Sequence, residues 1–133
     1  MPNPNPKEIE EWVSGRKSLA GENLRGADLS VSDLGEADLS GAKLQWANLW
    51  GAYLRQISLQ GADLQEADLQ GANLFRADLA GANLIGANFR EADLRGARLE
   101  RSRTDGAFFR RTNLSVFSSA PSWPTVWERL LED

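Results

Sequence analysis

Residues 62–81 read ADLQEADLQGANLFRADLAG, which is four consecutive five-residue units of the form A-[DN]-L-x-x. The leucine position recurs every fifth residue from Leu19 to Leu114, and seventeen of its twenty occurrences are Leu. Two residues before it stands Ala in fourteen of the twenty units, and two residues after it stands Gly in ten. An internal repeat therefore covers residues 17–116 and decides the fold.

A period of five fits neither a helix nor a flat strand. On an α-helix, five residues rotate the chain by about 500°, so the leucines would spiral around every face. On a strand, successive leucines would point to opposite sides. The leucines share one core only if the chain turns a corner once per repeat, always in the same direction. Leu and the preceding Ala then point inward, and Gly, Asn and Asp suit the tight corners.

The repeat resembles that of the pentapeptide-repeat family, as in Ala62-Asp63-Leu64-Gln65-Glu66 and the unit that follows it. The resemblance implies an all-β solenoid, namely a right-handed quadrilateral β-helix with four repeats per coil and about five coils. It also implies a bacterial, particularly cyanobacterial, setting. Polar or charged residues at inward positions, Lys17, Glu22 and Thr104, predict an irregular first coil and a local departure near the last one.

The charges test a coil of twenty residues independently of the resemblance. Residues twenty apart would lie in neighbouring coils about 4.8 Å apart, where like charges repel. At that spacing no acid of the repeats lies over an acid, and one basic pair stacks, Arg90 over Arg110. Three opposite pairs stack, Lys43 with Asp63, Asp78 with Arg98, and Glu91 with Arg111. Coils of fifteen or twenty-five residues would stack several like charges, so the pattern favours twenty.

Both ends of the solenoid need covers, because an open end exposes unpaired backbone. Residues 1–16 form the predicted N-terminal segment, with a capping helix over residues 6–13 and Ser14-Gly15 as its stop. Residues 117–133 form the predicted C-terminal turn and capping helix. Within that segment we expect apolar residues either to cap the core or to form an end-to-end dimer contact: Trp123, Trp127 and Leu131.

The composition excludes most catalytic chemistry. The chain contains no Cys and no His, which removes thiolate nucleophiles, the commonest metal ligand and the commonest general base. Its glycines follow the repeat and form no phosphate-binding loop, and its carboxylates follow the repeat as well. We therefore predict that the protein is not an enzyme, has no catalytic residue, and binds no cofactor and no metal.

The charge is acidic overall but unevenly distributed. The net charge is −4, which argues against nucleic acid as a partner. The segment 17–68 has eight acids and four bases, whereas the segment 90–111 has seven bases and four acids. This asymmetry is either chance clustering on a solvated surface or an axial dipole that orients a partner. With no signal peptide and no membrane-spanning run in the sequence, we expect a cytoplasmic protein.

Aromatic residues exceed what the repeat requires. Trp46, Trp50 and Tyr53 occupy outward positions in the predicted second coil. Phe75 lies between Arg55 and Arg95 at a spacing of twenty, where a cation–π stack is expected. These aromatics either bind a partner, as exposed Trp and Tyr often do, or only shield neighbouring strands.

The expected function is that of a non-enzymatic scaffold or protein-interaction module. Its partner would be a protein, and the chain would be a monomer or an end-to-end dimer. The resemblance also implies an alternative, a DNA mimic that binds a type II topoisomerase such as DNA gyrase. A mimic would need a more acidic surface than this chain offers.

Overall fold

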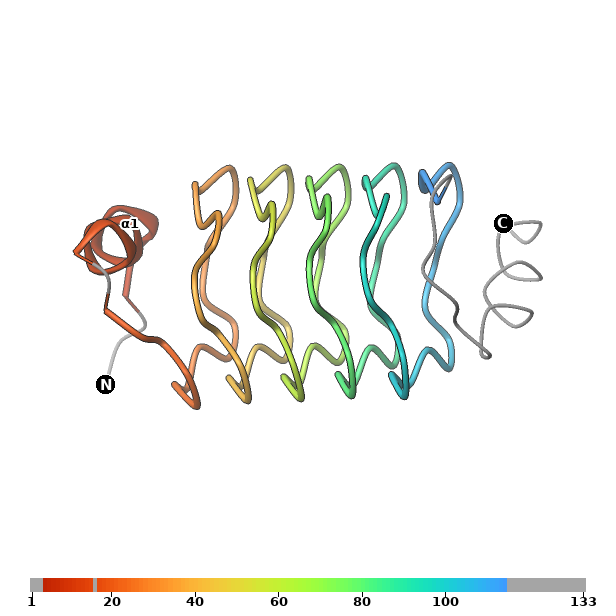
Figure 1. The fold of residues 1–133 in the computed structure, drawn as a ribbon, viewed down its shortest axis with the longest axis horizontal. Coiled ribbons are helices and arrows are strands. Elements are labelled where there is room, and N and C mark those ends of the chain that lie inside the picture. Colours follow the sequence, from red (N-terminus) through yellow and green to blue (C-terminus); the bar gives the residue numbers. More distant parts are fainter. Residues whose placement is uncertain (1–3, 16, 115–133) are drawn as a thin grey trace.

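The chain folds into a solenoid whose coils stack along the long axis of the molecule (Figure 1). The computed structural model describes residues 4–15 and 17–114. One helix, α1 (Pro6–Ser14), lies at the N-terminal end of the stack. Counted from residue 17 in steps of twenty, the first coil is 17–36 and the second is 37–56.

Parallel backbone pairing joins each coil to the next at an offset of twenty residues. Bridges link Asp63 to Asn83 on one side of the coil and Asp68 to Asn88 on the next. Between one repeat and the next, the amide of Ala67 donates to the carbonyl of Leu64 at 3.0 Å, which closes the corner. The predicted twenty-residue period is confirmed, since the same bridge recurs on all four sides.

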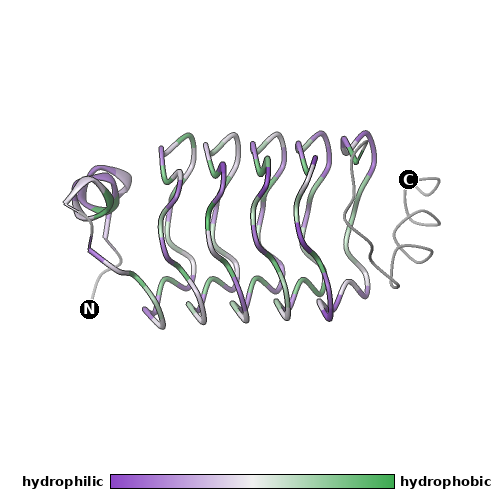
Figure 2. Ribbon diagram, in the orientation of Figure 1, coloured by the Kyte–Doolittle hydropathy of each residue, from purple (hydrophilic) through white to green (hydrophobic). Residues whose placement is uncertain are grey.

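The core is a set of parallel columns of leucine and alanine. Leu64 and Leu69 are fully buried, and so is Ala62. In one column the Phe89 and Phe109 rings stack with centroids 5.3 Å apart and planes inclined by 2°. Small and large side chains alternate along the chain, so a narrow interior fills without voids. Figure 2 shows the corresponding alternation of hydrophobic and hydrophilic residues around every coil.

Every corner of the described repeats requires a residue in the left-handed region. Ten of these corner residues are glycines, and nine carry a side chain. Asp and Asn side chains stabilise the same corners, because they accept the amide two residues on. Asn73 Oδ1, for example, accepts from the amide of Phe75 at 3.1 Å. Glycine is favoured at the corners because a left-handed conformation costs other residues about 1–2 kcal/mol.

α1 begins and ends on local signals. Asn5 caps its start by accepting the amide of Glu8 at 2.9 Å, and Gly15 follows its end. The helix extends one residue past the predicted 6–13. Ile9 is fully buried in the solenoid core, and Trp12 and Val13 pack against that core. The predicted C-terminal helix lies outside the described residues.

The polar and charged residues at inward positions of the repeat differ in their burial. Lys17 and Glu22, at inward positions of the first coil, are exposed. Thr104 is buried in place of a leucine. Thr112 replaces an inward alanine and donates its hydroxyl to the carbonyl of Phe89 at 2.6 Å, which satisfies the buried polar group.

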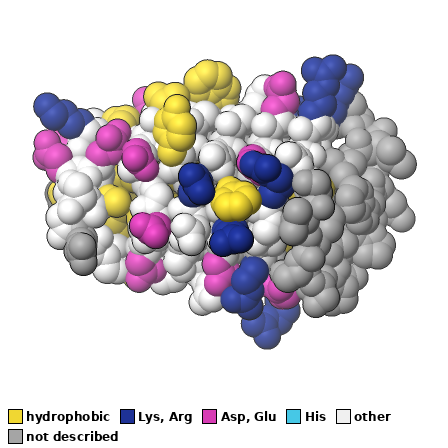
Figure 3. Space-filling view, turned by 45° about the horizontal axis from the view of Figure 1, so that its top comes forward, with side chains coloured by type: hydrophobic (Ala, Val, Ile, Leu, Met, Phe, Trp, Pro, Cys, Tyr) yellow, Lys and Arg dark blue, Asp and Glu magenta, His cyan; other side chains and the backbone are white. Residues whose placement is uncertain are grey.

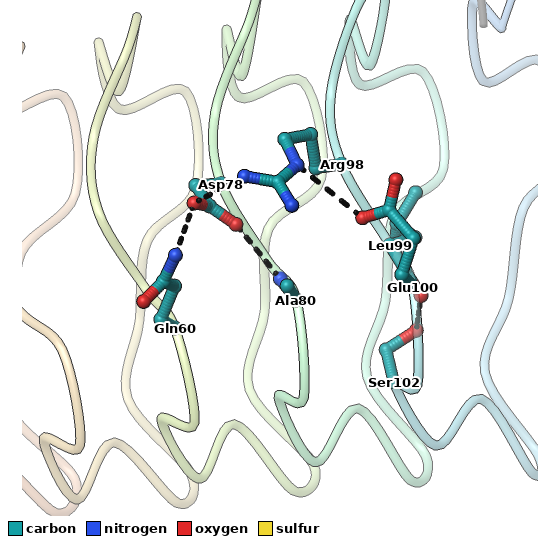
Figure 4. A network of polar contacts seen from close by, with 7 residues as sticks. All are labelled: Gln60, Asp78, Ala80, Arg98, Leu99, Glu100 and Ser102. Carbon is teal, nitrogen blue, oxygen red and sulfur yellow. Dashed lines mark hydrogen bonds and ion pairs between the residues drawn. The ribbon is translucent and has the colours of Figure 1, made fainter. Parts of the chain in front are cut away.

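One predicted charge pair forms an ion pair on the surface (Figure 4). Arg98 lies 3.4 Å from Asp78, one coil away, and 3.4 Å from Glu100. Asp78 also accepts from Gln60 Nε2 at 2.6 Å. The backbones of Lys43 and Asp63 pair across neighbouring coils. The Asp63 carboxylate, however, accepts a hydrogen bond from Gln45 Nε2 at 2.8 Å rather than pairing with the Lys43 side chain. Glutamine amides therefore compete with cations for these carboxylates.

Candidate interaction surface

Large hydrophobic side chains are exposed around the second coil. The exposed fractions are 65% for Trp46, 51% for Trp50 and 55% for Tyr53, and Val31 of the first coil reaches 56%. The amide of Val31 donates to the carbonyl of Trp50 at 2.9 Å. The Val31 side chain also lies over Gly51, 3.3 Å from where a Cβ would stand. Trp46, Trp50, Tyr53 and Val31 together are called the aromatic patch. Val31 was not among the predicted surface residues, because only aromatic residues were singled out by the repeat pattern.

Two members of the aromatic patch occupy strained corners. Trp46 has φ 60° and Val31 has φ 50°, where most other corners carry glycine or a polar residue. A β-branched or bulky side chain with positive φ is a genuine outlier. Such conformations persist where the surrounding structure fixes them, as the repeat does at nine side-chain-bearing corners, and they cluster at functional sites.

Replacing Trp46 with glycine is expected to raise the free energy of unfolding by about 0.5–1 kcal/mol. The gain is the relief of left-handed strain, reduced by the extra freedom of glycine in the unfolded chain. Urea denaturation of the wild type and of Trp46→Gly measures the difference in the free energy of unfolding. Gln56→Gly, at an equivalent corner with φ 57°, should give a similar gain. A loss of stability specific to Trp46→Gly would mean that the indole stabilises the coil.

Phe75 lies at the centre of three arginines. The guanidinium carbon lies 5.3 Å from the ring centroid for Arg55, 5.3 Å for Arg95 and 5.2 Å for Arg76. Basic side chains surround a hydrophobic one on the face drawn in Figure 3. The predicted stack of Arg55, Phe75 and Arg95 is confirmed, and Arg76, the next residue in the same corner as Phe75, joins it. Arg55, Phe75, Arg76 and Arg95 together are called the cation–π ladder. The ladder places aromatic and basic side chains next to Tyr53.

Asp93 binds Arg95, the last arginine of the cation–π ladder. Its carboxylate accepts from Arg95 Nε at 2.9 Å and from Arg95 Nη2 at 2.7 Å, a bidentate geometry. Hydrogen bonding from the Arg95 side chain, followed by the Arg95 amide, holds the pKa of Asp93 below its ordinary value despite partial burial. Arg95 is thereby fixed against Phe75.

Acid should weaken the fold through such carboxylates. A lowered folded-state pKa contributes stability that is present above the unfolded pKa of about 3.9 and is lost as the pH falls through the folded value. Asp93→Asn should therefore reduce the loss of stability between pH 6 and pH 2, as followed by thermal unfolding. Asn73→Ser, in the same column, is the control, since it removes no titrating group. An identical pH dependence in wild type and Asp93→Asn would contradict the assignment.

A second arginine–aromatic contact lies near the last described coil. The guanidinium of Arg90 lies 4.2 Å from the centroid of Phe108. A shallow hollow of about 310 Å³ is lined by Arg90, Glu91, Arg110 and Arg111. The predicted basic pair of Arg90 and Arg110 thus lines one hollow.

Within residues 4–15 and 17–114, no group of three His, Cys, Asp or Glu side chains is placed to hold a metal ion. Nor does that part of the chain contain a helix long and apolar enough to cross a membrane. The predicted end contact of Trp123, Trp127 and Leu131 lies outside the described residues.

Solved structures with the same repeat resemble this chain. A pentapeptide repeat protein from Nostoc is 37% identical, with a TM-score of 0.62 over 86% of this chain and 99% of that one. A pentapeptide repeat protein from the thylakoid lumen of Arabidopsis thaliana is 27% identical, with a TM-score of 0.63 over 84% and 74%. QnrB1, a plasmid-mediated fluoroquinolone resistance protein, is 20% identical over 77% and 59%, with a TM-score of 0.36. The QnrB1 likeness is too low to bear on function.

No protein with a curated description matches the chain. The family model for pentapeptide repeats matches in eight copies, over residues 18–45, 37–74, 72–103 and 92–115. These matches span nearly all of the repeats described above. The chain therefore belongs to the pentapeptide-repeat family.

Proposed function

We propose that this pentapeptide-repeat protein is a non-enzymatic interaction module that binds a partner protein through the aromatic patch and Phe75. The exposure of several large hydrophobic side chains around one coil carries the proposal. The strained backbone of Trp46 supports it, because stability alone would favour glycine there.

The surface has the properties of a preformed binding site. Its side chains project from hydrogen-bonded coils, so little backbone ordering would be needed on binding. Trp and Tyr are enriched among the residues that dominate binding energy, and Arg is enriched with them. Trp50 and Tyr53 supply the apolar area, while Arg55 supplies a charged rim.

We also propose the number of coils, the caps at both ends and the oligomeric state. About five coils would form the β-helix, with α1 closing the N-terminal end and a second cap at the other. Capped ends favour a monomer, with an end-to-end dimer as the alternative. We place the protein in the cytoplasm and assign it no cofactor.

The alternative is a DNA mimic that binds a type II topoisomerase. Such a mimic needs a continuous negative surface, whereas basic residues outnumber acidic ones over 90–111. A DNA gyrase supercoiling assay tests it directly. We expect no inhibition at a large molar excess, and inhibition would favour the mimic.

The proposal is tested by affinity capture from a lysate of the organism that expresses the chain. We expect the doubly substituted Trp50→Ser, Tyr53→Ser form to lose a protein that the wild type retains. Phe108→Ser is the matched control, since Phe108 is 39% exposed but lies outside the aromatic patch. Retention of every captured protein by the double variant would refute the proposed surface.

A further inference from the structure

Gly35 is an exception among the glycines of the repeats. The others occupy corners with positive φ, where glycine relieves strain, but the backbone of Gly35 lies outside that region. A Cβ on Gly35 would meet only ordinary van der Waals contacts, at 3.5 Å from the carbonyl oxygen of Arg55 and from Asp33 Oδ1. Neither backbone geometry nor packing therefore requires a glycine at this position.

The missing side chain leaves one face of the cation–π ladder open. Gly35 occupies the position that Arg55, Phe75 and Arg95 occupy in the next three coils. Phe75 covers Arg55 on one side, with the guanidinium carbon 5.3 Å from the ring centroid. On the other side, next to Gly35, is a hollow of about 500 Å³, here called the Gly35 notch, lined by Asp33, Gly35, Glu36, Tyr53, Arg55 and Gln56.

Two further hollows, against α1, share Gly35 with the Gly35 notch. One, of about 460 Å³, is lined by Glu10, Glu11, Asp33 and Gly35, together with Lys7, Val13 and Ser14. The other, of about 500 Å³, is lined by Gly35, Glu36 and Asp38, together with Lys17, Ser18, Ala37 and two residues of α1. Gly35 thus lines three hollows on this side of the first two coils, two of which are also lined by residues of α1.

The described walls of these three hollows carry more carboxylates than cationic side chains. Asp33 accepts the amide of Gly35 through Oδ1 at 3.2 Å. Within the described part of the chain, neither Asp33 nor Glu36 forms an ion pair. Glu10 and Glu11 add two carboxylates from α1. Over the three hollows, five carboxylates outnumber three cationic side chains, those of Lys7, Lys17 and Arg55. This excess of negative charge favours a cation, while the open guanidinium face of Arg55 favours a planar ring.

We propose that the Gly35 notch receives an aromatic side chain of a partner protein that has a basic residue next to it in sequence. The ring would stack on Arg55 and contact Tyr53, which extends the ladder of Arg95, Phe75 and Arg55 by one step. The neighbouring cation would lie against Asp33 and Glu36. This inference rests on the proposed interaction function and names the chemistry of its partner.

The probe is the dipeptide acetyl-Trp-Arg-amide, titrated into the full chain labelled with ¹⁵N. We expect amide shifts confined to the first two coils around Gly35, Glu36 and Arg55. Acetyl-Trp-Glu-amide should bind at least about tenfold more weakly, because carboxylates line the notch. Acetyl-Ala-Arg-amide should also bind more weakly, because it lacks the ring.

The blocking variant is Gly35→Arg, which fills the notch with the residue that the same column holds at positions 55 and 95. We expect it to weaken acetyl-Trp-Arg-amide binding by at least about tenfold, since stacking on Arg55 is lost. The matched control, Ala20→Arg, places the same side chain at the equivalent exposed position on a neighbouring side of the coil and should bind normally. If Gly35→Arg fails to fold, the Glu36→Gln, Asp33→Asn form tests the cation preference instead.

The outcomes separate this inference from the proposed function. Shifts at the notch that Gly35→Arg abolishes would support the inference. Equal binding of the Arg and Glu dipeptides, or shifts elsewhere, would overturn it, and so would unchanged binding to a folded Gly35→Arg. Lysate capture that fails with the Trp50→Ser, Tyr53→Ser form but survives in Gly35→Arg would overturn the inference and leave the proposed function standing.

Discussion

Replacing Leu69 with alanine is expected to lower the free energy of unfolding by about 2–5 kcal/mol. Leu69 is fully buried and lies between Leu49 and Phe89 in one interior column. The coils above and below are held by parallel backbone hydrogen bonds, so they cannot collapse into the space that the truncation leaves. Urea denaturation, followed by circular dichroism, measures the loss.

The matched control is Gln65→Ala in the same coil. The Gln65 side chain is directed outward and donates to Asp63 at 3.2 Å, a partly solvated contact. Its removal should cost less than about 1 kcal/mol. Equal losses for Leu69→Ala and Gln65→Ala would contradict the assignment of the two residues to inside and outside.

The second large effect is expected at the N-terminal end, where Ile9→Asp should cause self-association. Ile9 is fully buried against the first coil, and a carboxylate there would be desolvated without a partner. α1 would detach and uncover backbone that has no preceding coil. Lys43, for example, donates its amide to Glu22 at 2.9 Å, but the equivalent bond from Asn23 would need a residue that precedes the repeats. Open solenoid ends associate.

Light scattering at several protein concentrations tests this expectation. The mass of Ile9→Asp should rise with concentration, whereas Glu10→Gln, on the exposed side of α1, should match the wild type. An unchanged mass for Ile9→Asp, with α1 shown to be detached by loss of helical signal, would mean that the solenoid needs no cover at this end.

Much of this architecture could be predicted from sequence because each repeat obeys one local rule. Inward positions, the coil length and the stack of Phe89 on Phe109 all follow from counting in fives and twenties. The same counting predicted that Phe75 would lie between Arg55 and Arg95. It could not predict that Asp63 would prefer Gln45 to Lys43, because that choice depends on side-chain reach and conformation.

The sequence by itself determined the period, the core columns, the family and the outward placement of Trp46, Trp50 and Tyr53. Each depends on residue type at a regular spacing, and both can be read directly from the sequence. Only the tertiary structure showed that Arg76 completes the ladder and that Gly35 has no backbone need for glycine. The first depends on the direction of a corner side chain, and the second on the φ angle of Gly35 and on its neighbours in two coils. The spacing does show that Gly35 stands one residue after Leu34, whereas the other repeat glycines stand two residues after the leucine position. The φ angle of Gly35 and the contacts of Arg76 follow only from the folded backbone.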